Sequence, residues 1–161
     1  MPAPKLRAAH AATARRDEDA LIRRAIAVLE RRVFRHSHDL LCAHDLRQYL
    51  RLKLAGRKEE VLAAVFLDSQ WRAIAFEPLF RGTLNAAPLY PRVVARRALK
   101  HNAAGVVVAH NHPSGLAEPS RADITATAQL KSALSLVGVE LWEHLIIGRG
   151  EPFSFSDAQM L

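Results

Sequence analysis

Apolar residues recur at helical spacing in the first part of the chain. From Asp17 they form one stripe with arginines on the other side, and Asp17, Glu18 and Asp19 fall in the first turn. Acidic residues near the start and basic residues towards the end suit the helix dipole. We therefore predict a helix that begins at Asp17. The Ala-rich, basic residues 1–16 before it are expected to be a frayed arm.

A second helical stripe covers residues 43–54, and the pattern then changes to that of strands. Residues 61–67 are an uninterrupted apolar run followed by turn residues, which predicts a hairpin with residues 71–76. The elements expected further along are a continuation of the sheet (80–84), a helix (91–101), a buried strand (105–109), a helix (120–136), a strand (139–147) and a short closing strand (153–155). The pattern predicts an α/β (α+β) fold: one mixed sheet flanked by helices, with a basic helical extension in front.

The charge is concentrated at one end of the chain. The 161 residues suit one domain with some extra length, and the net charge is +7. Residues 1–58 carry 14 basic and 6 acidic side chains (+8), whereas the remaining 103 carry 9 basic and 10 acidic (−1). An excess of this kind indicates a polyanion partner for the first part of the chain. Candidate DNA contacts are Arg15, Arg16, Arg23, Arg24, Arg31 and Arg32.

Cysteine usage and hydropathy limit the cellular setting. The single cysteine, Cys42, excludes an intramolecular disulfide framework and fits a reducing compartment; we expect it to be a buried apolar residue. The N-terminus lacks the apolar core of a secretory signal, and no window approaches a membrane span. A cytoplasmic location without a membrane partner is therefore expected. His36, His38 and His44 have spacings that suggest no site, and we expect them at the solvated surface.

The chemistry-bearing stretch is residues 106–123 (VVVAHNHPSGLAEPSRAD). His110 and His112 stand two apart at the end of a strand, so both imidazoles can point to one side. Ser120 is a natural N-cap for the next helix, and Asp123 is its third residue. Two imidazoles and a carboxylate are a standard ligand set for catalytic zinc. Taken separately, Ser-x-x-Asp is also a capping arrangement and His-x-His also occurs on surfaces.

This spacing resembles the metal signature of the JAMM (MPN or JAB domain) metalloprotease superfamily. The run HNHPSG…PSRAD resembles its bacterial RadC branch, as do FLDSQ (66–70), LFRGTLNAAPLYPR (79–92) and EHLIIG (143–148). The resemblance implies a cytidine-deaminase-like MPN/JAB domain over residues 40–161, behind a basic arm and helix (1–39). It also implies that His110, His112 and Asp123 bind zinc and that Ser120 hydrogen-bonds the activated water or the tetrahedral intermediate.

The resemblance further implies a general base at the start of an earlier strand. Glu59 and Glu60 both precede the apolar run, and aligning FLD places Glu60 on the family position. Alternation lets only one of them face the site, so we choose Glu60 and expect Glu59 to be solvated. The chain departs from the RadC pattern at Val93, where glutamate is usual, and at Glu143, where aspartate is usual. Its N-terminal extension is also too short for the full helix-hairpin-helix region of long RadC proteins.

Three functions remain open from the sequence. The first is a zinc-dependent hydrolase that cleaves peptide or isopeptide bonds in a protein substrate. The second is a DNA-repair or recombination protein that binds nucleic acid through its basic extension, or a nuclease that uses the same metal. The third, a non-catalytic scaffold, fits poorly with the intact His/His/Ser/Asp set. Iron or manganese can replace zinc in such a ligand set. His144, near the end of a strand, could approach the site, but we interpret it as a structural histidine with satisfied hydrogen bonds.

Overall fold

A mixed sheet forms the centre of the structure, a computed structural model that describes residues 4–34, 42–82 and 89–161. Within these residues the strands run in the order β2-β1-β3-β4-β5. The pairs β1–β2, β1–β3 and β4–β5 are antiparallel, whereas β3–β4 is parallel. The elements are α1 (Pro4–Val33), α2 (Ala43–Leu54), β1 (Val61–Leu67), β2 (Ala73–Arg81), α3 (Pro91–Lys100), β3 (Gly105–Asn111), α4 (Arg121–Ser135), β4 (Glu140–Ile147) and β5 (Phe153–Ser154). The expected mixed sheet flanked by helices is confirmed.

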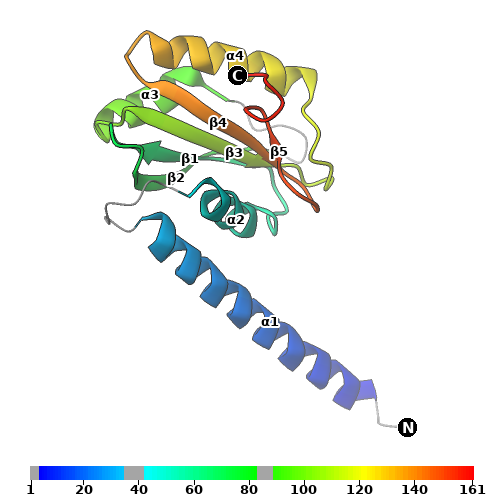
Figure 1. The fold of residues 1–161 in the computed structure, drawn as a ribbon. Helices are drawn as coiled ribbons and strands as arrows, with labels where there is room; N and C mark the ends of the chain where they lie inside the picture. Colours follow the sequence, from blue (N-terminus) through cyan, green and yellow to red (C-terminus); the bar gives the residue numbers. More distant parts are fainter. Residues whose placement is uncertain (1–3, 35–41, 83–88) are drawn as a thin grey trace.

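Helices cover both faces of this sheet, as Figure 1 shows. On one face, α2 and the end of α1 pack on odd-numbered residues of the central strands, including Val65 and Val107. On the other face, α3 and α4 pack on even-numbered residues, including Phe66 and Val108. Because β1 and β3 are buried on both faces, they are apolar throughout instead of alternating. Whether a polar residue at the end of β1 or β3 is odd- or even-numbered therefore decides which face of the sheet, and which pair of helices, its side chain meets.

The first helix is longer than the sequence pattern predicts. It begins at Pro4, so the expectation of a frayed arm over residues 1–16 is wrong for most of that segment. Alanine is the strongest helix former and proline is tolerated at the first helical position, so the Ala-rich segment extends the helix. The N-terminal part of α1 projects away from the sheet, and only its last turns pack on α2 (Figure 1).

The second helix belongs to the core of the domain, although it lies within the basic first 58 residues. Tyr49, Leu50 and Leu54 are fully or almost fully buried against the sheet. The Tyr49 hydroxyl donates to Glu30 Oε1 of α1 at 3.1 Å, which ties the two helices together. The part of the basic extension that lies clear of the core is therefore the portion of α1 before its last turns.

Local differences from the predicted elements have simple causes. The partner strand of the hairpin starts at Ala73, because Asp68 accepts hydrogen bonds from the N–H groups of Gln70 and Arg72 and so organises the turn. Cys42 is exposed, contrary to expectation, since it precedes the first turn of α2 at the surface. His44 is exposed, as expected. The expectations for His36, His38, residues 83–84 and the domain boundary at residues 39 and 40 lie outside the described residues. No helix in the described parts of the chain is both long enough and apolar enough to cross a membrane.

Candidate metal centre

Two histidines meet at the end of β3. His110 is the second-last residue of β3 and pairs with Leu62 of β1. His112 follows the strand directly. Their Nε2 atoms lie 3.0 Å apart, which confirms that both imidazoles point to one side. His110 is buried, whereas the His112 side chain is 18% exposed, so the pair is open to solvent on one flank.

The carboxylate comes from the first turn of α4. Ser120 is the N-cap of this helix: its hydroxyl accepts from the Asp123 N–H at 3.1 Å, and its own N–H donates to Asp123 Oδ2 at 2.7 Å. The same carboxylate lies 3.2 Å (Oδ1) from His110 Nε2 and 3.6 Å (Oδ2) from His112 Nε2. The capping box and the candidate metal centre therefore share Asp123, and one arrangement does not exclude the other.

The charge of Asp123 is stabilised by its neighbours. Burial acts to raise its pKa, but the contact with His110 and the hydrogen bonds from Ser120 outweigh this effect and hold the pKa well below its usual range. The positive end of α4 acts in the same direction. Asp123 is thus an anion at any pH at which an imidazole can also bind a cation.

The second ring nitrogen of each histidine is engaged elsewhere. His112 Nδ1 lies 2.9 Å from the carbonyl oxygen of Leu116, which can only accept, so Nδ1 carries the proton and Nε2 keeps its lone pair. His110 Nδ1 lies 2.8 Å from His144 Nε2. Both Nε2 atoms therefore face the same point as the Asp123 carboxylate. Partners of this kind orient the histidines of metal sites.

The spacing of these atoms fits a small ion. One ligand atom from each of His110, His112 and Asp123 lies within 4.8 Å of the others, and the shortest separations are 3.0, 3.2 and 3.6 Å. Ligands at about 2.0–2.1 Å from a tetrahedral zinc ion are about 3.3 Å apart. The separations bracket this value, and nitrogen and carboxylate donors are those that zinc accepts. The residues present therefore fit zinc, with one coordination position left for water or substrate.

Glu60 lies at the same end of the sheet as the two histidines. Leu62 is directly opposite His110, so Glu60, two residues earlier, falls on the same face by alternation. Glu60 is buried, whereas the Glu59 side chain is 46% exposed and pairs with Arg81 at 3.7 Å. The solvated position expected for Glu59 is confirmed. The role of Glu60 as general base stays a prediction.

The structure gives Ser120 a more definite part than the sequence did. Its hydroxyl lies 2.6 Å from Asp123 Oδ2 and donates its proton to that carboxylate. Ser120 therefore positions the candidate ligand in addition to any contact with substrate. Its predicted contact with the activated water or the intermediate is not tested by this geometry and stays a prediction.

The loop between the two ligand-bearing elements is held by close backbone contacts. Arg149 N–H donates to the Gly115 carbonyl at 2.9 Å, and Gly115 has a φ of +88°. A Cβ on Gly148 would lie 2.6 Å from the Gly115 oxygen, so only glycine fits there. This packing fixes the loop that carries the Leu116 carbonyl, and through it the ring of His112.

Sequence reasoning missed Thr127, and it placed His144 near the site as a structural histidine without naming its partners. Both are buried, and His144 connects His110 to Thr127, with 2.7 Å between His144 Nδ1 and Thr127 Oγ1. Burial, and then the nearby His110, lower the pKa of His144 to about 3, so this imidazole is neutral. A signal for Thr127 was present: Ser120, Asp123 and Thr127 are spaced three and four apart, on one face of the predicted helix. The pairing of β4 with β3, which brings His144 to His110, could not be read from spacing.

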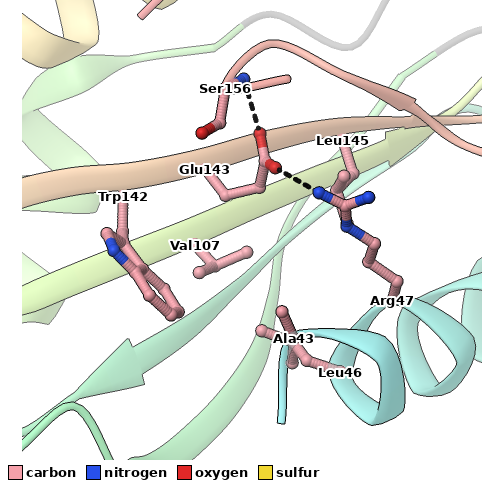
Figure 2. Close-up of a pocket in the computed structure, with 8 residues that line it drawn as sticks. All are labelled: Ala43, Leu46, Arg47, Val107, Trp142, Glu143, Leu145 and Ser156. Carbon is pink, nitrogen blue, oxygen red and sulfur yellow. Dashed lines mark hydrogen bonds and ion pairs between the residues drawn. The ribbon is translucent and has the colours of Figure 1, made fainter. Parts of the chain in front are cut away.

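Glu143, a departure from the RadC pattern, lies on the opposite face of the sheet from His144. Its carboxylate accepts from Ser156 N–H at 3.1 Å and from Ser154 Oγ at 2.6 Å, and Arg47 of α2 lies 3.5 Å away (Figure 2). Glu143, Ser156 and Arg47 line a small cavity of about 150 Å³, whose other walls are the apolar side chains of Ala43, Leu46, Val107 and Leu145 and the indole of Trp142. Glu143 thus links α2 to the C-terminal strands and does not contribute to the candidate metal centre.

The predicted nucleic-acid contacts all lie along α1. Arg15, Arg16, Arg23, Arg24, Arg31 and Arg32 are exposed. Arg32 has an ion pair with Asp45 at 3.7 Å. The acidic residues 17–19 interrupt the arginines on the same helix, which leaves residues 12–25 with four basic and three acidic side chains. The basic surface is therefore less concentrated than the charge count of the first 58 residues suggests.

The fold and the site together define a class of protein. A mixed sheet whose parallel β3–α4–β4 unit brings a His-x-His pair beside an aspartate at a helix N-terminus has the architecture of a JAB (MPN) domain. A family profile described as RadC-like JAB domain matches residues 40–160. The chain belongs to the RadC-like JAB domain family, as its motifs predicted.

Curated relatives agree with this assignment. A UPF0758 protein of Methylibium petroleiphilum is 53% identical over 116 residues, which cover 72% of this chain and 52% of the relative. A UPF0758 protein of Cellvibrio japonicus is 51% identical over 130 residues (76% and 58%), and one of Coxiella burnetii is 46% identical over 142 residues (86% and 63%). The chain thus spans between about half and under two thirds of the length of these relatives.

Proposed function

We propose that this chain is a metal-dependent hydrolase that uses zinc to cleave peptide or isopeptide bonds. The observation that carries the proposal is the convergence of His110 Nε2, His112 Nε2 and the Asp123 carboxylate on one point, with each remaining ring nitrogen held by a partner. An isolated capping box would not need two oriented imidazoles beside it. A surface His-x-His pair would not need its second nitrogens fixed.

His110, His112 and Asp123 would hold the ion. When bound, zinc supplies a Lewis acid that polarises the substrate carbonyl and makes water a nucleophile near neutral pH. Glu60, on the same face as His110, takes the proton from the attacking water and delivers it to the leaving amine. Ser120 turns its hydroxyl from Asp123 towards the developing oxyanion, while its N–H continues to hold the carboxylate.

Apolar side chains beside the centre support an amide substrate. Leu116, in the loop after His112, is 64% exposed, and Ile124, next to Asp123, is 39% exposed. Apolar side chains beside the ligands suit the side chains of a peptide.

The test is a substrate screen with the full chain loaded with zinc. Peptide, isopeptide and DNA substrates are compared for the wild type and for the double variant His110→Ala/His112→Ala, with exposed His44→Ala as the control. We expect amide hydrolysis that the double variant loses by at least about 10³-fold and that His44→Ala retains. Metal-dependent cleavage of DNA alone would replace this proposal with a nuclease. Amide hydrolysis that persists in the double variant would also contradict it.

We propose nucleic-acid binding as a second function, separate from the hydrolytic centre. It is supported by the exposed arginine pairs of α1. The N-terminal part of this helix projects away from the sheet (Figure 1). Because phosphate contacts are made by such flexible basic side chains, this function would reside in α1 and leave the sheet unchanged.

A further inference from the structure

A buried chain of hydrogen bonds runs behind the candidate metal centre. His110 Nδ1 lies 2.8 Å from His144 Nε2, and His144 Nδ1 lies 2.7 Å from Thr127 Oγ1. Thr127 Oγ1 in turn donates to the backbone carbonyl of Asp123 at 2.6 Å. His144 and Thr127 are each 1% exposed, so water does not compete for these bonds. The chain thus connects one candidate ligand, His110 on β3, to another, Asp123 on α4.

The direction of each bond follows from the last one. A carbonyl oxygen only accepts, so the Thr127 hydroxyl donates its single proton to the backbone carbonyl of Asp123. The Thr127 oxygen must then accept from His144 Nδ1–H. A neutral imidazole carries one N–H, so His144 Nε2 has a lone pair and accepts from His110 Nδ1–H. His110 Nε2 is left without a proton and faces His112 and Asp123.

We propose that His144 and Thr127 are positioning residues that hold His110 in the Nδ1–H tautomer, with the Nε2 lone pair presented to the metal. This inference rests on the proposed metal centre but not on the nature of the substrate. A threonine hydroxyl that bonds to the carbonyl four residues earlier is common in helices. Thr127 differs from such helical threonines because it has a second partner. This partner is the buried His144 on β4, which itself contacts the candidate ligand His110.

The tautomer can be read directly in the metal-free full chain. Long-range ¹H–¹⁵N correlation spectra of the histidine side chains distinguish Nδ1–H from Nε2–H. We expect His110 in the Nδ1–H form in the wild type and in Thr127→Ser, and a mixture of forms in Thr127→Val, which keeps the size of the side chain but loses the hydroxyl. His112 is the internal reference, because Leu116 fixes its proton independently, and it should stay Nδ1–H throughout.

Zinc affinity gives the second measurement, by competition with a chelator. We expect Thr127→Val to weaken binding about 10- to 100-fold and Thr127→Ser to stay within about threefold of the wild type. His144→Gln can still accept from His110, whereas His144→Asn can only reach Thr127, so Gln should retain more affinity than Asn. A role in packing alone would lower stability without this order of affinities and without a change of tautomer.

Two results would overturn the inference. One is a wild-type His110 in the Nε2–H form, which can be seen even if every variant fails to fold. The other is an unchanged tautomer and unchanged zinc affinity in folded Thr127→Val and His144→Asn. Failure of the proposed hydrolysis has a different outcome: the tautomer and the zinc affinities would follow the expected order although no amide substrate is cleaved.

Discussion

Asn111 holds Val61 by its side chain: Asn111 Oδ1 accepts from the Val61 N–H at 2.9 Å. The same amide donates to the carbonyl of Glu59 at 3.1 Å, so it bonds the backbone on both sides of Glu60. Asn111 is buried and lies between the two histidines, but alternation turns it to the other face of the sheet. The strand that supplies the candidate ligand His110 therefore also holds the backbone on both sides of the candidate base.

Replacement of Asn111 by leucine should impair the positioning of Glu60 without impairing zinc binding by the histidines. Asn111→Leu leaves a buried N–H and a carbonyl without their partner, which should cost about 2–4 kcal/mol of unfolding free energy. We expect hydrolysis to fall about 10- to 100-fold because Glu60 loses its fixed position, with zinc affinity within about threefold of the wild type. Urea unfolding, kinetics and chelator competition measure the three quantities. A parallel loss of zinc affinity would show that Asn111 acts on the histidines instead.

Removal of the charge of Glu60 should stop the chemistry without removing the metal. Glu60→Gln keeps the shape of the side chain but cannot accept a proton, so we expect turnover to fall about 10²- to 10⁴-fold. Metal content, measured by elemental analysis of the purified protein, should be unchanged. Glu59→Gln is the matched control, since Glu59 is solvated and should be dispensable. Undiminished turnover in Glu60→Gln would remove this residue from the role of base.

The close packing of Gly148 on the loop at Gly115 predicts a sensitive position. In Gly148→Ala the new Cβ would meet the Gly115 oxygen at 2.6 Å and Ala117 N at 2.8 Å, so the loop must shift. We expect a loss of about 1–3 kcal/mol in stability and roughly tenfold weaker zinc binding, because the Leu116 carbonyl that holds His112 moves with the loop. In Gly150→Ala the Cβ meets no atom within 4 Å, and this control should behave as wild type.

Glu77 should contribute stability that depends on pH. It accepts from Arg97 Nε at 2.5 Å and lies 2.6 Å from His101 Nε2, which joins β2 to α3. Burial acts to raise its pKa, but Arg97 and His101 outweigh burial, so the pKa lies below its ordinary value. A depressed carboxyl pKa stabilises the fold above the unfolded-state value of about 4.5 and loses this effect as the pH falls through the folded-state value.

The corresponding variant is Glu77→Gln. At pH 7 we expect it to be about 1–2 kcal/mol less stable than the wild type. The difference should shrink as the pH is lowered below about 4.5, because the wild-type carboxyl then becomes protonated. Denaturant unfolding of both proteins at several pH values measures this. A difference that stays constant across the acid range would mean that packing, and not charge, accounts for the loss.

The arginines of α1 can be tested without removal of the core helix α2. Arg15, Arg16, Arg23 and Arg24 are replaced together by glutamine, and binding to duplex DNA is followed by anisotropy between 50 and 200 mM salt. Each lost phosphate contact should reduce the slope of log affinity against log salt by about 0.9. We expect weaker binding with a smaller slope in the variant. Equal affinity and slope in the two proteins would remove α1 as the site of DNA binding.

The sequence predicted the elements well wherever one local pattern was decisive. The apolar run of β1 and the stripe of α2 have the expected bounds, because burial on both faces and helical periodicity are visible in a single segment. The Nε2 atoms of His110 and His112 meet because strand alternation brings them together, and Asp123 joins them because a helix N-cap fixes its position. These three residues could therefore be chosen before the fold was known.

The features that escaped prediction depend on pairing or on context. The contact of His144 with His110 follows from the register of β4 against β3, in which Val108 pairs with His144, and no local pattern specifies a register between strands. Cys42 was expected inside because of its residue type, but its place before α2 puts it at the surface. The start of α1 was placed too late because the charged turn at residues 17–19 is a stronger signal than an alanine-rich segment.

The chain of hydrogen bonds from His110 through His144 and Thr127 to the Asp123 carbonyl suggests that folding does not depend on metal loading. It is completed by protein groups alone, and it joins β3, β4 and α4, whose contacts already enclose an apolar core. Small zinc domains, by contrast, have no folded state without their ion. We therefore expect this protein to keep its architecture when a chelator strips the centre, and an ion to raise its melting temperature only by mass action. If this expectation holds, different divalent ions can be compared in the centre on one preparation of folded protein.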